Sequence, residues 1–179
     1  MAGGARGSTV TFGSDVTDWV RQTQARMDAV FRESVQRVVG VMQTSVAQGG
    51  NMPVDTGFLR ASLQMTVNAP VPVDPKARPA DGKAYAYNPD SVALVIAGAT
   101  VGDHLFASYT AAYALPVHYG FEAREATDGS DGKPAQKARK GRAGRQWVTL
   151  AAQQWPAIVA AVCAETQQAV QAAKPAREL

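Results

Sequence analysis

One long run of helical periodicity constrains this 179-residue chain more than any other feature. Between Ser14 or Asp15 and about Gln48, apolar residues recur at steps of three and four, which places them on one face of an α-helix. They include Val16, Trp19, Val20, Met27, Val30, Phe31, Val35, Val38, Met42 and Val46. At ~1.5 Å per residue such a helix reaches about 50 Å, longer than a small domain is wide. We therefore expect one end of it to pack against a neighbouring chain.

The segment after this helix, residues 53–63, reads PVDTGFLRASL and predicts a structured turn. Pro53 and Gly57 bracket the turn. The side chain of Asp55 or Thr56 is expected to accept a hydrogen bond from a free backbone amide of a short helix. Arg60 follows Asp55 by five residues and is expected to pair with its charge.

A second motif, residues 113–120, reads YALPVHYG. Tyr113 and Tyr119 flank Pro116, and we expect both rings to pack inward with their hydroxyls hydrogen-bonded. Gly120 permits a turn that a residue with a β-carbon resists. The motif thus predicts a second structural turn.

The remaining patterns predict the fold class. Residues 63–67, 92–96 and 104–109 have strand character, and 146–172 form an amphipathic helix that Pro156 divides into two segments meeting near Trp155. Cys163 on this helix is expected to be a small buried hydrophobe. The prediction is an α+β fold with a small antiparallel or mixed β-sheet. The sheet is packed with the long N-terminal helix and the C-terminal helix, and extended loops complete the fold.

The predicted organisation is a flexible arm, 1–13, followed by one domain, 14–179, with two extensions. The first extension, 68–90, holds five of the ten prolines and is expected to be a long loop or extended arm. In a ring-forming protein such an arm often reaches onto the next subunit. The second extension is a basic loop, 121–145, expected to be mobile in isolation.

The basic loop reverses the sign of the charge along the chain. Residues 133–145 hold six cations and no acid, and without them twelve basic residues face fifteen acidic ones, a net of −3 against +3 for the whole chain. The cations are Lys133, Lys137, Arg139, Lys140, Arg142 and Arg145. Such a loop predicts contact with an acidic partner or with nucleic acid, and a merely solvated loop is the alternative.

No motif in the chain predicts catalysis, a cofactor or a metal. The single cysteine excludes an internal disulfide and fits a reducing cytoplasm, and no apolar run approaches the roughly 20 residues that span a bilayer. Neither His104 nor His118 belongs to a zinc spacing. The sequence Val-Asp-Thr-Gly at 54–57 also surrounds the catalytic aspartate of aspartic proteases. That chemistry requires a second carboxylate, and no second Asp-Thr-Gly or Asp-Ser-Gly occurs, so a structural turn is favoured.

The two motifs, in their order along the chain, resemble those of the neck or tail-completion proteins of long-tailed bacteriophages. In that family a Pro-x-Asp-Thr-Gly-x-Leu-Arg-x-Ser segment follows the first helix. A Tyr-Ala…Tyr-Gly segment comes later, and an aromatic amphipathic helix closes the chain. Two features depart from the pattern: His118 stands where the family has Glu or another charged residue, and the basic insertion replaces a shorter link.

The resemblance implies a non-enzymatic virion protein, assembled in the host cytoplasm and located at the head–tail junction. It implies a homo-oligomer, a ring of six copies by analogy. Its partners would be the head connector or stopper and the tail tube or terminator, with non-specific contact to channel DNA. A tail terminator is the alternative within this class, and a DNA-binding protein or an aspartic protease lies outside it.

Overall fold

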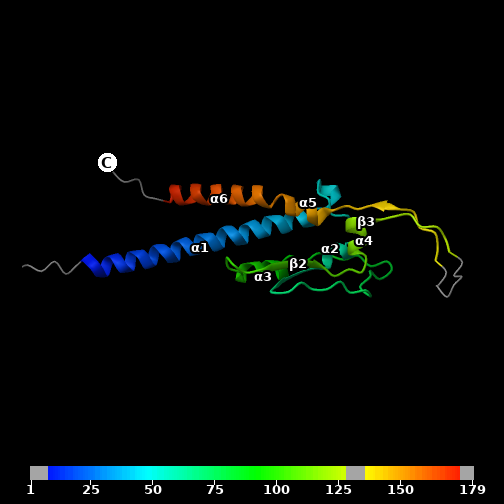
Figure 1. Ribbon diagram of the computed structural model, residues 1–179, viewed down its shortest axis with the longest axis horizontal. Coiled ribbons are helices and arrows are strands. Elements are labelled where there is room, and N and C mark those ends of the chain that lie inside the picture. The colour runs from blue at the N-terminus through cyan, green and yellow to red at the C-terminus, as the bar shows by residue number, and fades with distance from the viewer. Residues whose placement is uncertain (1–7, 128–135, 174–179) are drawn as a thin grey trace, which may run out of the picture.

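The computed structural model describes residues 8–127 and 136–173, and their fold is α+β (Figure 1). A single long helix, α1 (Ser8–Gln43), runs through most of the length of the structure. Residues 8–13, expected in a flexible arm, belong to α1, while 1–7 lie outside the described residues. The helix also ends five residues earlier than predicted, and a 3-10 turn, η1 (Val46–Gln48), follows. The backbone bonds from Val46 N to Met52 O (3.0 Å) and from Met52 N to Thr44 O (3.2 Å) turn the chain back at this point.

The C-terminal helix lies beside α1 and consists of two segments, as predicted. Helix α5 (Trp147–Gln153) and helix α6 (Trp155–Ala172) meet at an angle of 46°. Pro156 stands in the first turn of α6, where its missing N–H costs no helical hydrogen bond. Within the described residues no single helix is long and apolar enough to cross a membrane, and only the bent pair α5–α6 taken together reaches that length and composition.

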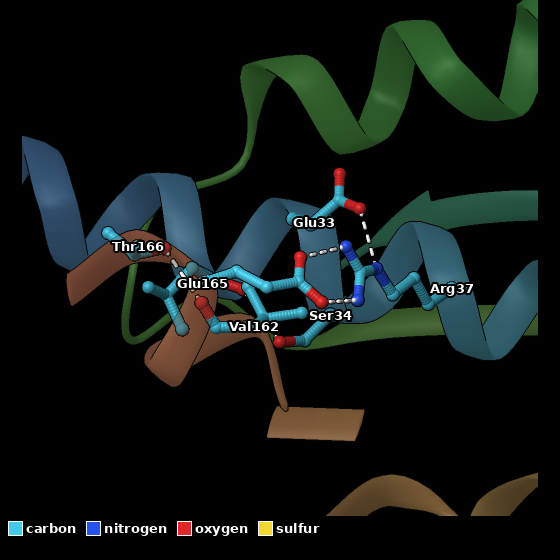
Figure 2. Close-up of polar contacts among 7 residues, drawn as sticks. Glu33, Ser34, Arg37, Val162, Glu165 and Thr166 are labelled. Carbon is cyan, nitrogen blue, oxygen red and sulfur yellow. Dashed lines mark hydrogen bonds and ion pairs between the residues drawn. The ribbon is translucent and has the colours of Figure 1, made fainter. Parts of the chain in front are cut away.

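An ion-pair cluster joins α1 to α6 (Figure 2). The Arg37 guanidinium donates to both carboxylate oxygens of Glu165, at 2.9 and 2.6 Å, and its Nε donates to Glu33 at 2.7 Å. The hydrogen bond from Arg37 holds the pKa of Glu165 below its usual value, and the same bonds raise the pKa of Arg37 further. The cluster fixes the register of the two helices across 128 residues of sequence.

The main sheet contains two antiparallel strands, β1 (Leu63–Val67) and β2 (Leu105–Tyr109), with Leu63 opposite Tyr109. Both were predicted. The strand predicted at 92–96 is wrong, because these residues form helix α3 (Asp90–Gly98). Val92 and Ile96 are buried one helical turn apart, and the Asn88 side chain accepts a bond from the Asp90 amide at 2.9 Å. A five-residue apolar run fits a buried strand or a buried helix by periodicity. Packing and capping decided for a helix at 92–96.

The core lies between the C-terminal half of α1, the β1–β2 sheet, α3 and α5. Its largest fully buried side chain is Trp147, whose ring meets that of Tyr109 edge-to-face at 5.5 Å. The other large members are Val35, Val39, Met42, Met52, Leu59, Leu63, Met65, Val92 and Ile96. Among residues 12–43 of α1, the buried ones lie at or after residue 34, so the described N-terminal part of the helix extends beyond the core.

The proline-rich segment, expected to be a long loop or an extended arm, is a long loop that packs on its own chain. Its backbone bonds the stretch after β2 through Asp74 N to Thr110 O (2.9 Å) and Ala112 N to Ala77 O (3.0 Å). No helix or strand lies between β1 and α3, so the backbone N–H and C=O groups of this segment need other hydrogen-bond partners. The stretch after β2 supplies some of these partners.

The basic loop forms a second, two-stranded sheet, where a mobile loop was expected. Strand β3 (Gly120–Phe121) pairs antiparallel with β4 (Arg142–Ala143), and isolated bridges join Arg124 to Arg139 and Thr127 to Gln136. The four backbone bonds at those bridges measure 2.7–3.0 Å. We call residues 120–127 and 136–145 the hairpin stem; it projects from the body of the molecule (Figure 1). Lys133 lies outside the described residues.

Candidate functional site

The two sequence motifs, 50 residues apart, line one pocket of about 430 Å³ together with the base of the hairpin stem. We call it the motif pocket. The first motif contributes Asp55, Thr56 and Gly57, the second contributes Tyr113 and Val117, and the stem contributes Arg142 and Arg145. Pro53, Val54, Phe58 and Leu59 of the first motif also line the pocket, together with Val46 and Pro79.

Gly57 shapes the first wall of the motif pocket. It begins the one-turn helix α2 (Phe58–Ala61) with φ at +82°, a conformation that glycine adopts without strain. A β-carbon there would collide with the Tyr85 carbonyl oxygen. The Tyr85 amide in turn donates to the Thr56 carbonyl at 2.8 Å, so the first motif and the proline-rich segment lie in direct backbone contact.

Gly57 stands at the N-cap position of α2, and of the two candidate capping residues only Thr56 accepts a bond from a nearby amide. The Thr56 hydroxyl accepts a long bond, 3.4 Å, from the Phe58 amide, whereas the Asp55 carboxylate is exposed on the pocket wall. The expected pairing of Asp55 with Arg60 is wrong. The ion pairs among the described residues join other groups, and the Arg60 guanidinium lies 5.7 Å from the centre of the Tyr87 ring. Helix α2 turns the chain between the two residues and directs Arg60 toward the proline-rich segment.

The second motif forms helix α4 (Ala114–Tyr119) and a turn at Gly120, whose φ is +84°. Tyr113 is half-buried with its ring 6.3 Å from that of Phe58, and burial raises the pKa of Tyr113 while a backbone hydrogen bond from Leu59 lowers it. The expectation of an inward ring fails for Tyr119, which is 70% exposed. The helical turn places residues 113 and 119 on different sides, whereas an open turn would allow both rings inward.

His118 lies behind the motif pocket as a buried residue. Its Nε2 is 3.1 Å from the Thr149 hydroxyl, and its ring meets the Tyr119 and Trp147 rings edge-to-face at 4.6 and 4.8 Å. Nδ1 has no hydrogen-bond partner among the described residues. Burial lowers the pKa of His118, so the neutral ring is favoured.

Two aromatic residues of the proline-rich segment, Tyr85 and Tyr87, contact side chains of the first motif without lining the motif pocket, and the sequence analysis missed them. The Tyr85 ring packs edge-to-face on Phe58 with centroids 4.9 Å apart, and the Lys83 ammonium lies 5.1 Å above its face. The Arg60 guanidinium lies over the face of the Tyr87 ring. The alternation Tyr-Ala-Tyr at 85–87 was the available signal, because paired aromatic rings in a loop usually pack on something.

The chemistry of the motif pocket suits recognition of a chain segment. Its lining combines the Asp55 carboxylate, the Arg142 and Arg145 guanidinium groups and the half-buried Tyr113. Such walls bind backbone and charged side chains of a partner by hydrogen bonds. Within residues 8–127 and 136–173, no group of three or more His, Cys, Asp or Glu side chains is placed to hold a metal ion.

A second concave surface, the helix groove, runs between α1 and α6 with a volume of about 600 Å³. Its apolar walls come from Met27, Val30 and Phe31 of α1 and from Val159, Cys163 and Val170 of α6. Cys163, expected to be buried, is half-buried on the wall of this groove.

Comparisons with protein-family models, with curated proteins and with solved structures gave no match to this chain. The motif pocket, the helix groove and the hairpin stem are therefore the features on which a function can be based.

Proposed function

We propose that this protein is a structural component of a phage virion that joins the head connector to the tail. It forms a ring of identical subunits at the head–tail junction, six by analogy with the family that the motifs resemble. Its neighbours are the head connector or stopper on one side and the tail tube or terminator on the other.

The observation that carries this proposal is the uncovered apolar face of α1. The exposed fractions of Phe12, Trp19, Val20 and Met27 are 71, 66, 50 and 52%. The 36 residues of α1 extend over about 54 Å at ~1.5 Å per residue, and only the C-terminal half of the helix covers the core. Contiguous apolar surface of this kind marks a protein interface. In Figure 1 the blue end of α1 extends past the red end of α6.

A ring follows from two different apolar surfaces on one chain. Phe12, Trp19 and Val20 of the apolar face of α1 lie outside the helix groove, whereas Met27 belongs to both surfaces. These N-terminal residues of one copy docking in the groove of the next give a head-to-tail interface. A head-to-tail interface that repeats by rotation closes into a ring. The motif pocket is left for a partner at one face of that ring.

Native mass spectrometry and negative-stain electron microscopy of the purified chain test the assembly. We expect a closed ring for the wild type and a folded monomer for Val20→Glu/Met27→Glu, since the new carboxylates would be buried in the interface. Ala25→Glu/Ala29→Glu is the matched control, because both alanines are exposed on the other side of the helix and their change should not disturb the ring. A wild-type chain that stays monomeric at all concentrations while its circular dichroism shows a folded protein contradicts the proposal.

Location in the virion needs a separate measurement. In phage particles that encode this chain, we expect peptide mass spectrometry to detect it and immunogold labelling to place it at the neck. Its absence from tailed, mature particles would contradict a joining role even if the ring forms.

A further inference from the structure

We infer that the hairpin stem is a binding site for double-stranded DNA, which it contacts through the phosphate backbone without reading sequence. The inference rests on the stem of one chain and does not depend on ring formation. Residues 128–135, outside the described residues, are not used in it.

The charge of the chain is concentrated on the stem. Its residues include six cations and two acids, Glu122 and Glu125, a net of +4, so the rest of the chain carries −1. The six cations are Arg124, Lys137, Arg139, Lys140, Arg142 and Arg145, and all are exposed. A concentrated positive field on a near-neutral body attracts a polyanion to that one element.

Among the described residues, no ion pair neutralises this positive charge. The ion pairs among the described residues are Arg21–Asp18, Arg37–Glu33 and Arg37–Glu165, and none involves the stem. The Arg124 guanidinium donates instead to the Lys137 carbonyl at 3.5 Å, and the Arg139 guanidinium lies 4.0 Å from the centre of the Phe121 ring. These contacts orient the guanidinium groups and leave their charge available to phosphate.

The shape of the stem matches a DNA groove. The major groove is about 12 Å wide and admits a two-stranded β-ribbon. One side of the stem, residues 120–127, contains β3 and the two isolated bridges, and its eight residues extend over about 25 Å at ~3.3 Å per residue. With one base pair per ~3.4 Å, that length covers roughly seven base pairs, enough for several phosphate contacts on both strands.

An acidic protein surface fits the stem less well than DNA does. Protein interfaces have an apolar core, often aromatic, whereas DNA interfaces are polar and strongly positive. Phe121 is the only large apolar side chain among the described stem residues, and the Arg139 guanidinium covers its ring. The remaining stem residues are Gly, Ala, Thr, Gln and charged side chains.

Fluorescence anisotropy of a labelled 30-base-pair duplex, titrated with the full chain at several KCl concentrations, tests the inference. We expect the logarithm of the binding constant to fall linearly with the logarithm of salt. Lys137→Gln/Arg139→Gln/Lys140→Gln should lower the magnitude of that slope by about 2.7 and weaken binding at 0.1 M salt by on the order of 10²-fold. Lys76→Gln/Arg78→Gln/Lys83→Gln is the control with the same loss of charge, and its slope should equal that of the wild type.

Three outcomes would overturn the inference. The first is that the wild type shows no affinity for the duplex at 50 mM KCl. The second is that both triple variants lose affinity equally. The third is that the wild type binds polyglutamate and does not bind DNA. The last result would assign the stem to an acidic protein. If the triple variant does not fold by circular dichroism, the three single variants replace it, each with a slope lower by about 0.9.

Discussion

Replacement of Gly57 by alanine should destabilise the fold much more than the same change at Gly82. Both glycines have left-handed backbone conformations, with φ at +82° and +68°. A β-carbon at Gly82 meets nothing within 4 Å, whereas one at Gly57 collides with the Tyr85 carbonyl oxygen. The pair therefore separates the cost of backbone conformation from the cost of moving the proline-rich segment.

The magnitude follows from the contacts at Tyr85. Alanine in a left-handed conformation costs about 1 kcal/mol, and this is the whole effect expected at Gly82. At Gly57 the displaced segment also loses the bond from Tyr85 N to Thr56 O, about 1 kcal/mol, and the edge-to-face contact of Tyr85 with Phe58, about 1 kcal/mol. Gly57→Ala should thus cost about 3 kcal/mol in free energy of unfolding.

Urea unfolding of both variants measures the difference directly, and thermal unfolding should show it as well. For a chain of this size about 2–4 °C is lost per kcal/mol, so we expect a fall in Tm of roughly 6–12 °C for Gly57→Ala and 2–4 °C for Gly82→Ala. Hydrogen exchange at the Tyr85 amide should accelerate in the first variant only. Equal costs for the two variants, within about 0.5 kcal/mol, would refute the close packing of the proline-rich segment on the first motif.

Three further results are expected. Trp147→Ala should cost about 3–5 kcal/mol in urea unfolding because it removes the largest buried side chain of the core, while Leu94→Ala, at a residue that is 76% exposed, should cost no more than about 0.5 kcal/mol. Burial lowers the His118 pKa from 6.5, so on acidification the unfolded state binds the proton before the folded state does. The contribution of His118 to the free energy of unfolding should therefore be full above pH 6.5 and fall as the pH drops toward the folded-state pKa. His118→Gln should remove that part of the pH dependence. The hydrogen bond from Arg37 lowers the Glu165 pKa from 4.5, so the contribution of Glu165 to stability is present above pH 4.5 and lost on acidification. At pH 7, Glu165→Gln should speed amide hydrogen exchange in α6, and Gln168→Ala should not.

Much of the fold could be read from local patterns. Strands β1 and β2 and the break of the C-terminal helix at Trp155 follow from side-chain alternation and from Pro156, which act over a few residues. The strand expected at 92–96 could not be excluded in this way. A short apolar run suits a buried strand or a buried helix, and the core that receives Val92 and Ile96 comes from α1 and β1.

The candidate sites were only partly predictable. The sequence located Asp55, Gly57, Tyr113 and the basic stretch as separate features, and the hairpin stem organises the described part of that stretch. It did not show that Tyr85 packs on the first motif, because that contact depends on how the proline-rich segment folds back along β2.

The sequence by itself determined the helical faces, the two main strands, the helix break and the place where positive charge accumulates, because each depends on residues adjacent in the chain. Only the tertiary structure decided that the two motifs share one pocket, that Arg60 turns to Tyr87 and that Arg37 joins α1 to α6. These contacts connect residues 27 to 128 positions apart. Which of many possible partners such a side chain meets depends on the packing of the whole core, and local propensity carries no information about it.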